Sequence, residues 1–148
     1  FIVPVPLHPD KLKKRGYNQA DLLGRGMAAA WGQCVAGMAS RTGEVMTATA
    51  DTASVDGRRR PVLLTDLLFK RRMNESQTRK NRSARWDNVQ SAYDVSGRSD
   101  LRARVAGKHL LLVDDVLTTG ATLESAASAL LAACPGVSLS VAVAATPV

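Results

Sequence analysis

The hydrophobic pattern toward the C-terminus predicts a strand, a helix and a second strand. The four apolar residues of Leu110–Val113 suit a strand that is buried on both faces. After a polar turn, apolar residues recur at helical spacing: Leu123, Ala126, Ala127, Leu130, Leu131 and Cys134. Pro135 and Gly136 end this helix, and then apolar residues alternate with small ones at Val137, Leu139, Val141 and Val143. This order predicts a right-handed βαβ unit with parallel strands.

The first forty residues predict a strand, a tight loop and an amphipathic helix. Residues 1–5 are strand-like, and Pro4 and Pro6 limit the pairing of that strand before a loop at Pro6–Pro9. Asn18 and Asp21 suit the cap and the first turn of a helix. Its apolar residues are Leu23, Met27, Ala30, Trp31, Cys34 and Met38. We expect this face to pack on the sheet.

The middle of the chain is less regular. Residues 40–60 are polar with little periodicity, which indicates an excursion or a mobile loop. Pro61–Phe69 fits a strand, a helix, or one followed by the other, and periodicity alone does not decide between them. Lys70–Asn88 is densely charged and has few apolar anchors, so it suits a mobile flap. A short strand is expected at Ser91–Val95, before a turn at Ser96 and Gly97.

Length and composition indicate one α/β domain. With 148 residues, of which 45% are hydrophobic, the chain supports one ordinary core, and we interpret residues 1–148 as a single domain. Aromatic residues make up only 4%, so Leu, Val, Ala and Met must fill that core. Such a core is expected where helices cover both faces of a parallel sheet.

Cysteine usage and hydropathy favour a reduced, cytoplasmic protein. The two cysteines, Cys34 and Cys134, lie far apart on the apolar faces of the two predicted helices. No apolar run approaches the roughly 20 residues of a membrane span, and no basic leader opens the chain. The chain begins directly as a strand without Met, which suggests that earlier residues exist or were removed.

The formal net charge of +7 predicts an anionic partner. A phosphorylated metabolite and a nucleic acid both meet that requirement. The shortage of aromatic residues for base stacking makes single-stranded nucleic acid the weaker alternative.

The residues after the Leu110–Val113 strand suit a sugar phosphate. Asp114 and Asp115 are expected at the carboxyl end of the strand, where open α/β sheets bind ligands. The following turn supplies hydroxyl groups, a flexible glycine and the unpaired N–H groups of a helix start. A P-loop is excluded because the turn has no Gly-Lys-Ser/Thr ending. The segment Gly24–Ala29 has the spacing Gly-x-Gly-x-x-Ala of a dinucleotide-binding turn. It lies inside a predicted helix rather than after a strand, so we interpret its small residues as helix-packing positions.

The segment from Leu110 to Thr122 resembles the 5-phosphoribosyl-1-pyrophosphate (PRPP) signature of type I phosphoribosyltransferases. The resemblance implies a parallel-sheet type I fold with a flexible hood. It also implies that Asp114 and Asp115, the catalytic pair, bind the ribose 2′- and 3′-hydroxyls. The 5′-phosphate would then be cradled by Thr118, Thr119, Gly120, Ala121 and Thr122.

Other segments resemble the competence protein F (ComF) family, whose members carry a domain of this type. The matching segments are Val3–His8, Arg15–Ala20, Gln77, Arg85, Asn88 and the pair Ala92 and Tyr93. Two features depart from the family. Its common cysteine-rich zinc-binding segment has no counterpart here, since no Cys-x-x-Cys occurs, and residues 41–60 are longer than the pattern requires.

The type I resemblance also implies a pyrophosphate loop after the first strand, with Pro6, Leu7 and His8 in it and Arg15 nearby. For His8, contact with the leaving group and a solvated position in a proline-bounded turn are both open. Lys11, Lys13 and Lys14 are interpreted as a solvated face.

The hood is expected at about residues 66–98. It contains a basic run, Lys70, Arg71, Arg72, Arg79, Lys80, Arg82 and Arg85. Closure over PRPP would bring positive charge to the pyrophosphate and exclude water. The residues assigned to this role are Arg71, Arg72, Gln77, Arg82 and Arg85.

The activity implied by the resemblance is transfer of a 5-phosphoribosyl group from PRPP to a nucleobase-like or amine acceptor, with release of pyrophosphate. Mg²⁺ would be the cofactor, held mainly by PRPP rather than directly by the protein. Two alternatives stay open. One is a non-catalytic PRPP- or nucleotide-binding accessory protein that works with competence and DNA-uptake proteins, and the other is a nucleic-acid-binding module.

Overall fold

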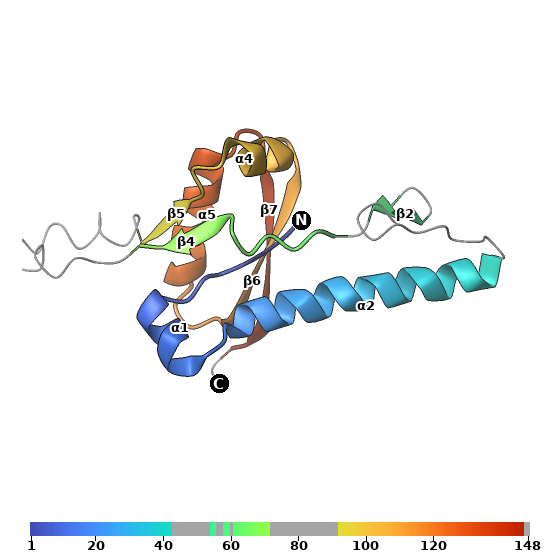
Figure 1. The fold of residues 1–148 in the computed structure, drawn as a ribbon, viewed down its shortest axis with the longest axis horizontal. Helices are drawn as coiled ribbons and strands as arrows, with labels where there is room; N and C mark the ends of the chain where they lie inside the picture. The colour runs from blue at the N-terminus through green and yellow to red at the C-terminus, as the bar shows by residue number, and fades with distance from the viewer. Residues whose placement is uncertain (43–53, 56–57, 60, 72–91, 147–148) are drawn as a thin grey trace, which may run out of the picture.

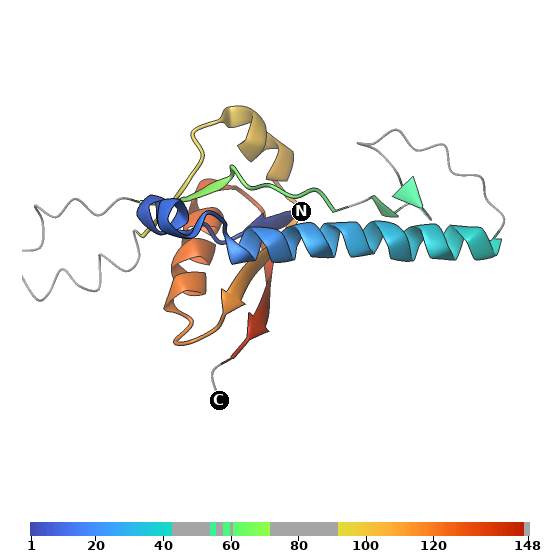
Figure 2. The ribbon, with the colours of Figure 1, turned by 60° about the horizontal axis from the view of Figure 1, so that its bottom comes forward.

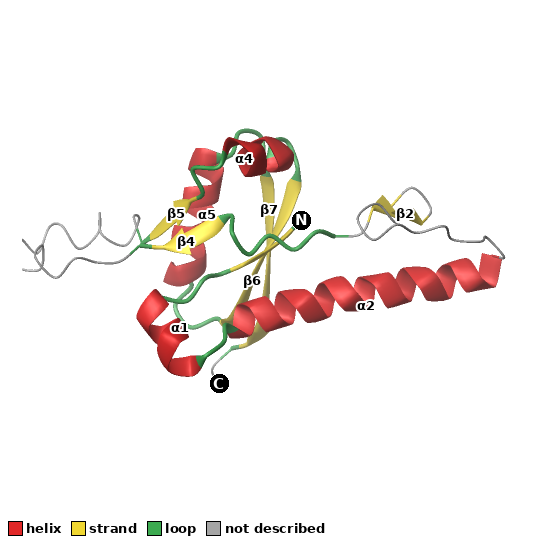
Figure 3. Ribbon diagram, in the orientation of Figure 1, coloured by secondary structure: helices red, strands yellow, loops and turns green. Residues whose placement is uncertain are grey.

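Three parallel strands form the centre of the protein. The computed structural model describes residues 1–42, 54–55, 58–59, 61–71 and 92–146. In the sheet, β6 (His109–Val116) lies between β1 (Ile2–Pro4) and β7 (Ser138–Ala145), and both neighbours run parallel to it. Leu63 extends the sheet by a parallel bridge to Ile2 on the other side of β1. The predicted α/β fold with a parallel sheet is confirmed (Figure 3).

Helices α2 (Gln19–Thr42) and α5 (Ala121–Ala133) cover opposite faces of this sheet. Ile2 faces α2, because a Cβ built on Gly24 would lie 3.3 Å from the Ile2 side chain. Its neighbour Val3 belongs to the cluster that holds Leu123 and Leu130 of α5. Since successive side chains of a strand point to opposite faces, the two helices lie on either side of the sheet.

The apolar face predicted for α5 is largely correct. Leu123, Ala126, Leu130 and Cys134 are buried in the core cluster. Leu131 is an exception, because 54% of it is exposed. Ala127, the remaining predicted position, is partly buried against the same cluster.

The apolar face predicted for α2 is wrong in its position along the helix. The residues that meet the sheet are Ala20 and Gly24, and both are buried. Met27 and Trp31 continue the same side of the helix but are 37% and 42% exposed. Figures 1 and 2 show the reason, since α2 runs well beyond the edge of the sheet.

A short antiparallel pair settles the segment that periodicity left open. Strand β4 (Leu68–Lys70) pairs with β5 (Tyr93–Val95), and the residues from 61 to 67 before it are not helical but contain a single bridge at Leu63 and a bend. Leu67 and Leu68 are buried in the core cluster. This pair packs on α5, and its two strands lead into and out of residues 72–91 (Figure 1). The short strand predicted near residue 93 is confirmed.

Four elements were not predicted from the sequence. Helix α1 (Pro9–Arg15) follows the tight loop, and helix α4 (Ser99–Val105) follows the turn after β5. The two-residue strands β2 (Ser54–Val55) and β3 (Arg58–Arg59) form an antiparallel pair within the polar segment. Helix α1 buries no residue, which explains why it gives no hydrophobic pattern.

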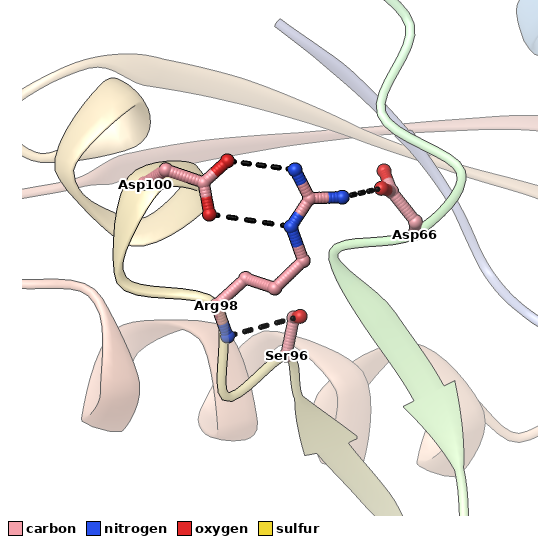
Figure 4. A network of polar contacts seen from close by, with 4 residues as sticks. All are labelled: Asp66, Ser96, Arg98 and Asp100. Atoms are coloured by element: carbon pink, nitrogen blue, oxygen red, sulfur yellow. Dashed lines mark hydrogen bonds and ion pairs between the residues drawn. The ribbon is translucent and has the colours of Figure 1, made fainter.

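An ion-pair network joins the segment before β4 to α4 (Figure 4). The guanidinium group of Arg98 contacts the carboxylate of Asp100 at 2.7 and 3.2 Å and that of Asp66 at 3.1 Å. The backbone N–H of Arg98 donates to the hydroxyl of Ser96 at 3.3 Å. All three charged side chains are exposed, so water screens the network and it contributes little to stability.

Much of the expected hood lies outside the described residues, including Arg72, Gln77, Arg79, Lys80, Arg82, Arg85 and Asn88. Residues 43–53 of the polar segment lie outside them too. Within the ranges that are described, no helix is both long enough and apolar enough to cross a membrane.

Candidate functional site

The paired aspartates lie at the carboxyl end of the central strand. Asp114 and Asp115 are the sixth and seventh residues of β6, and Asp114 pairs in register with Val143 of β7. Asp114 is only 8% exposed, while Asp115 is half-buried. The carboxylate of Asp114 accepts a hydrogen bond of 2.9 Å from the backbone N–H of Asp115.

The environment of Asp114 raises its pKa above the ordinary value of an aspartate. Burial is the main cause, and the nearby charge of Asp115 adds to it. The backbone hydrogen bond from Asp115 and the positive charge of Lys70 act in the opposite direction. A polar ligand that donates hydrogen bonds to this carboxylate would offset the cost of burying its charge.

The turn after β6 leaves its donors accessible. Thr118, Thr119 and Thr122 are exposed, and Gly120 lies at the N-cap of α5 with a φ of 80°. Only glycine adopts that conformation without strain. No side chain caps this helix through the N-cap residue, although the hydroxyl of Thr119 accepts a long hydrogen bond of 3.5 Å from the backbone N–H of Ala121. The start of α5 therefore has the exposed residues and the left-handed glycine that a turn needs in order to bind an anion.

The loop of Pro6, Leu7 and His8 lies at the same edge of the sheet. The backbone N–H of Val5 donates to the carbonyl of Val113 at 2.8 Å, so the loop leaves β1 beside the residue that precedes Asp114. His8 is the N-cap of α1, and its Nδ1 accepts from the backbone N–H of Asp10 at 3.3 Å. The side chain of His8 therefore has a structural role that neither of its sequence-based interpretations included.

Arg15 ends α1, and its guanidinium group donates to the side chain of Gln19 at the start of α2. Gly16 follows with a φ of 83° and turns the chain between the two helices. Arg15 and the lysines of α1 are exposed. The structure thus brings this basic helix to the end of the loop.

Lys70 is a candidate site residue that the sequence did not single out. It lies at the end of β4, where its ammonium nitrogen is 5.2 Å from the ring centroid of Tyr93. Its pKa is lowered, mainly by burial and also by the charge of Lys11, while the charge of Asp114 raises it. Lys70 therefore lies within electrostatic range of both the Asp pair and α1.

Tyr93 borders the same position from the core. It is 3% exposed, and burial together with the charge of Asp114 raises its pKa to about 12. Its buried ring lies beneath the ammonium group of Lys70, in the arrangement of a cation–π interaction. In contrast, Arg71, the next residue, has a bidentate ion pair with Asp94 at 2.7 and 2.9 Å.

The chain matches the family model of the phosphoribosyl transferase domain over residues 69–146. This range is more than half of the 148 residues. The chain belongs to the phosphoribosyl transferase domain family. Comparisons with curated proteins and with solved structures gave no significant match.

The phosphoribosyl transferase match runs from β4 to β7 and includes the Asp pair, the turn and the start of α5. It leaves out β1, the loop of Pro6–His8 and α1, which only the fold brings to the site. The sequence showed Lys70 as one of seven basic residues and Lys11 as part of a solvated face. Lys70 differs from the other basic residues of that run because it pairs with Tyr93 on the neighbouring strand. The sequence does not show this pairing, because the two residues are far apart along the chain.

Carboxylate oxygens such as those of Asp114 and Asp115 are ligands that Mg²⁺ prefers, alongside water and phosphate oxygens. In the described ranges no group of three or more His, Cys, Asp and Glu side chains is arranged to hold a metal ion. The donor set at this edge fits an ion that takes most of its ligands from a bound phosphate and water.

Proposed function

We propose that the protein binds PRPP at the carboxyl edge of the sheet and transfers its 5-phosphoribosyl group to a nitrogen acceptor. The observation that carries this proposal is the position of Asp114 and Asp115 at the carboxyl end of β6, directly before the exposed turn that starts α5. The charge of Lys70 on β4 acts on Asp114, and the basic helix α1 follows the loop that leaves β1 beside β6. PRPP has a group for each of these parts, namely a ribose, a 5′-phosphate and a pyrophosphate.

Each part of the site has a separate task in this proposal. The carboxylates accept hydrogen bonds from the two vicinal hydroxyls of the ribose. The turn from Thr118 to Thr122 holds the 5′-phosphate through its hydroxyls and N–H groups. The Pro6–His8 loop, Lys70 and Arg15 face the pyrophosphate. Arg71 and the hood residues Arg72, Gln77, Arg82 and Arg85 would add charge when the hood closes.

Mg²⁺ held mainly by PRPP would supply positive charge that offsets the charge of the leaving group. The protein residues do the remaining work. They hold the ribose in place, offer positive charge where negative charge develops on the pyrophosphate, and exclude water from C1. The bond from C1 to the pyrophosphate oxygen breaks, and a new bond to the acceptor nitrogen forms.

Membership of the ComF family is a finer proposal. It is supported by the residues Val3–His8 and Arg15–Ala20, both of which form the loop and helices beside the site. An association with competence and DNA-uptake proteins would follow from it. A cytoplasmic location stays a prediction from the cysteine usage.

Calorimetric titration of the protein with PRPP in the presence of Mg²⁺ tests the ligand. Binding that is lost in Asp114→Asn and Asp115→Asn is the expected result. A protein that binds neither PRPP nor pyrophosphate contradicts the proposal.

Release of pyrophosphate from PRPP with a panel of bases and amines then tests transfer. The expected result is release that requires both PRPP and one acceptor. PRPP binding without release for any acceptor would favour the non-catalytic accessory protein.

A further inference from the structure

The point where β1 becomes the Pro6–His8 loop is held by a side chain from another element. Asn18 donates a hydrogen bond from Nδ2 to the backbone carbonyl of Val5 at 3.0 Å. The backbone N–H of Val5 is already used by the carbonyl of Val113 in β6. Both backbone groups of Val5 are therefore fixed, one by the sheet and one by Asn18.

Asn18 is itself held in place by α2. Its Oδ1 accepts from the backbone N–H of Ala20 at 3.2 Å, and its backbone carbonyl accepts from Leu22 at 3.1 Å. These bonds fix which end of the amide faces Val5, because the oxygen is the end that accepts at the helix. Ala20 is buried against the sheet, so the side chain of Asn18 projects from a well-anchored helix start.

The loop has few means to hold its own shape. Pro4 and Pro6 lack backbone N–H groups on either side of Val5, so neither can donate to a neighbouring strand. At its other end the loop is held by the cap that His8 makes on α1. Pro6 and Leu7 lie between these two anchors, and together with His8 they are the residues proposed to face pyrophosphate.

We infer that Asn18 is a positioning residue that sets the shape of the Pro6–His8 loop through its hydrogen bond to Val5, and so controls how well the site binds pyrophosphate. This inference rests on the proposed function, since it assumes that the loop faces pyrophosphate. It differs from a helix-capping role in one chemical respect. A cap needs only an oxygen, which Ser and Asp supply equally well, whereas the bond to Val5 needs the N–H of an amide.

Asn18→Ser separates the two roles without adding charge. Its hydroxyl can cap α2, but it is too short to reach the Val5 carbonyl as well. Asn18→Asp is the second variant, because it keeps the cap fully and has no N–H to donate. Arg25→Ala is the matched control, since it removes the ion pair of 3.1 Å with Asp21 in the same helix and has no bond to the loop.

The experiment measures the dissociation constants of pyrophosphate, PRPP and ribose 5-phosphate by calorimetry with Mg²⁺, on the intact chain and the three variants. Loss of positioning in Asn18→Ser and Asn18→Asp is expected to weaken pyrophosphate and PRPP by about 10- to 100-fold. Ribose 5-phosphate should bind as before, because its groups face β6 and α5. Arg25→Ala should leave all three constants unchanged.

Equal weakening of all three ligands in both variants would show a general structural role and overturn the inference. The inference would also be overturned if both Asn18 variants bound pyrophosphate as tightly as the intact chain does. That result would leave the proposed function in place. An intact chain that binds neither pyrophosphate nor PRPP would overturn the proposed function and the inference together.

Discussion

Lys70 on β4 lies over the ring of Tyr93, its register partner on β5, with 5.2 Å between the ammonium nitrogen and the ring centroid. Both residues belong to the expected hood, and residues 71–92 separate them in sequence. Their pairing closes the base of that segment and fixes one cation near Asp114. The β4–β5 register holds Lys70 opposite Tyr93.

Replacing Lys70 with Met is therefore expected to weaken pyrophosphate and PRPP binding. A charged hydrogen bond contributes about 1.5 to 3 kcal/mol, so the dissociation constants should rise on the order of tenfold or more. Calorimetry with Mg²⁺ measures the effect. Lys108→Met is the control, because it removes the same charge just before the amino end of β6. If the two variants raised the dissociation constants equally, the affinity would depend on the net charge of the protein and not on the position of Lys70.

Asp114→Asn is expected to stabilise the free protein while it abolishes ligand binding. The folded pKa of Asp114 is raised, so the native state binds more protons than the unfolded state above the unfolded value of 3.8. Stability of the parent protein therefore falls as the pH rises from 3.8 through the folded pKa, and Asn does not share that loss.

Thermal unfolding at neutral pH and near pH 3.8 tests this prediction. The variant should have the higher midpoint at neutral pH, and the difference should shrink at the acid end. A lower midpoint at neutral pH would show that the carboxylate of Asp114 is stabilised in the folded protein.

Gly120→Ala is expected to weaken the binding of ribose 5-phosphate. A Cβ there meets only Leu117, at 3.8 Å, so the cost comes from the φ of 80° and is about 1 to 2 kcal/mol. Relief of that strain would move the N–H groups of the turn away from the phosphate. Gly136→Ala has comparable strain, at a φ of 69°, just before the amino end of β7. Gly136→Ala should lower the unfolding midpoint and leave the affinity for ribose 5-phosphate, measured by calorimetry, unchanged. A similar loss of affinity in both variants would contradict the proposal that the turn at Gly120 binds the phosphate.

Gly24→Val is expected to destabilise the protein without changing its affinity for PRPP. A Cβ at this position would lie 2.8 Å from the Leu63 side chain and 3.3 Å from Ile2, so α2 would be pushed from the sheet. Overpacking of this kind costs about 1 to 3 kcal/mol. Chemical denaturation gives the stability, and calorimetry gives the affinity. The folded fraction of the variant should bind PRPP with the affinity of the parent protein. Weaker binding by that folded fraction would indicate that the segment Gly24–Ala29 contacts a ligand.

Part of the fold could be predicted because its pattern is local. The run Leu110–Val113 and the spacing from Leu123 to Cys134 predict β6 and α5 correctly, since a buried strand and a helix face each impose their own period. Helix α1 buries no side chain and so has no such period. The extent of α2 that packs depends on the width of the sheet beneath it, which is why Met27 and Trp31 were misplaced.

By itself, the sequence determined the Asp pair at the end of a parallel strand and the hydroxyl-rich turn after it, because strand, turn and helix follow one another directly along the chain. Only the tertiary structure decided which distant groups join them. Strand pairing brings Val5 and its loop beside β6, and β4–β5 pairing brings Lys70 toward Asp114. The physical reason is that these contacts arise from the hydrogen-bond register and packing of the whole sheet, which no short stretch of sequence encodes.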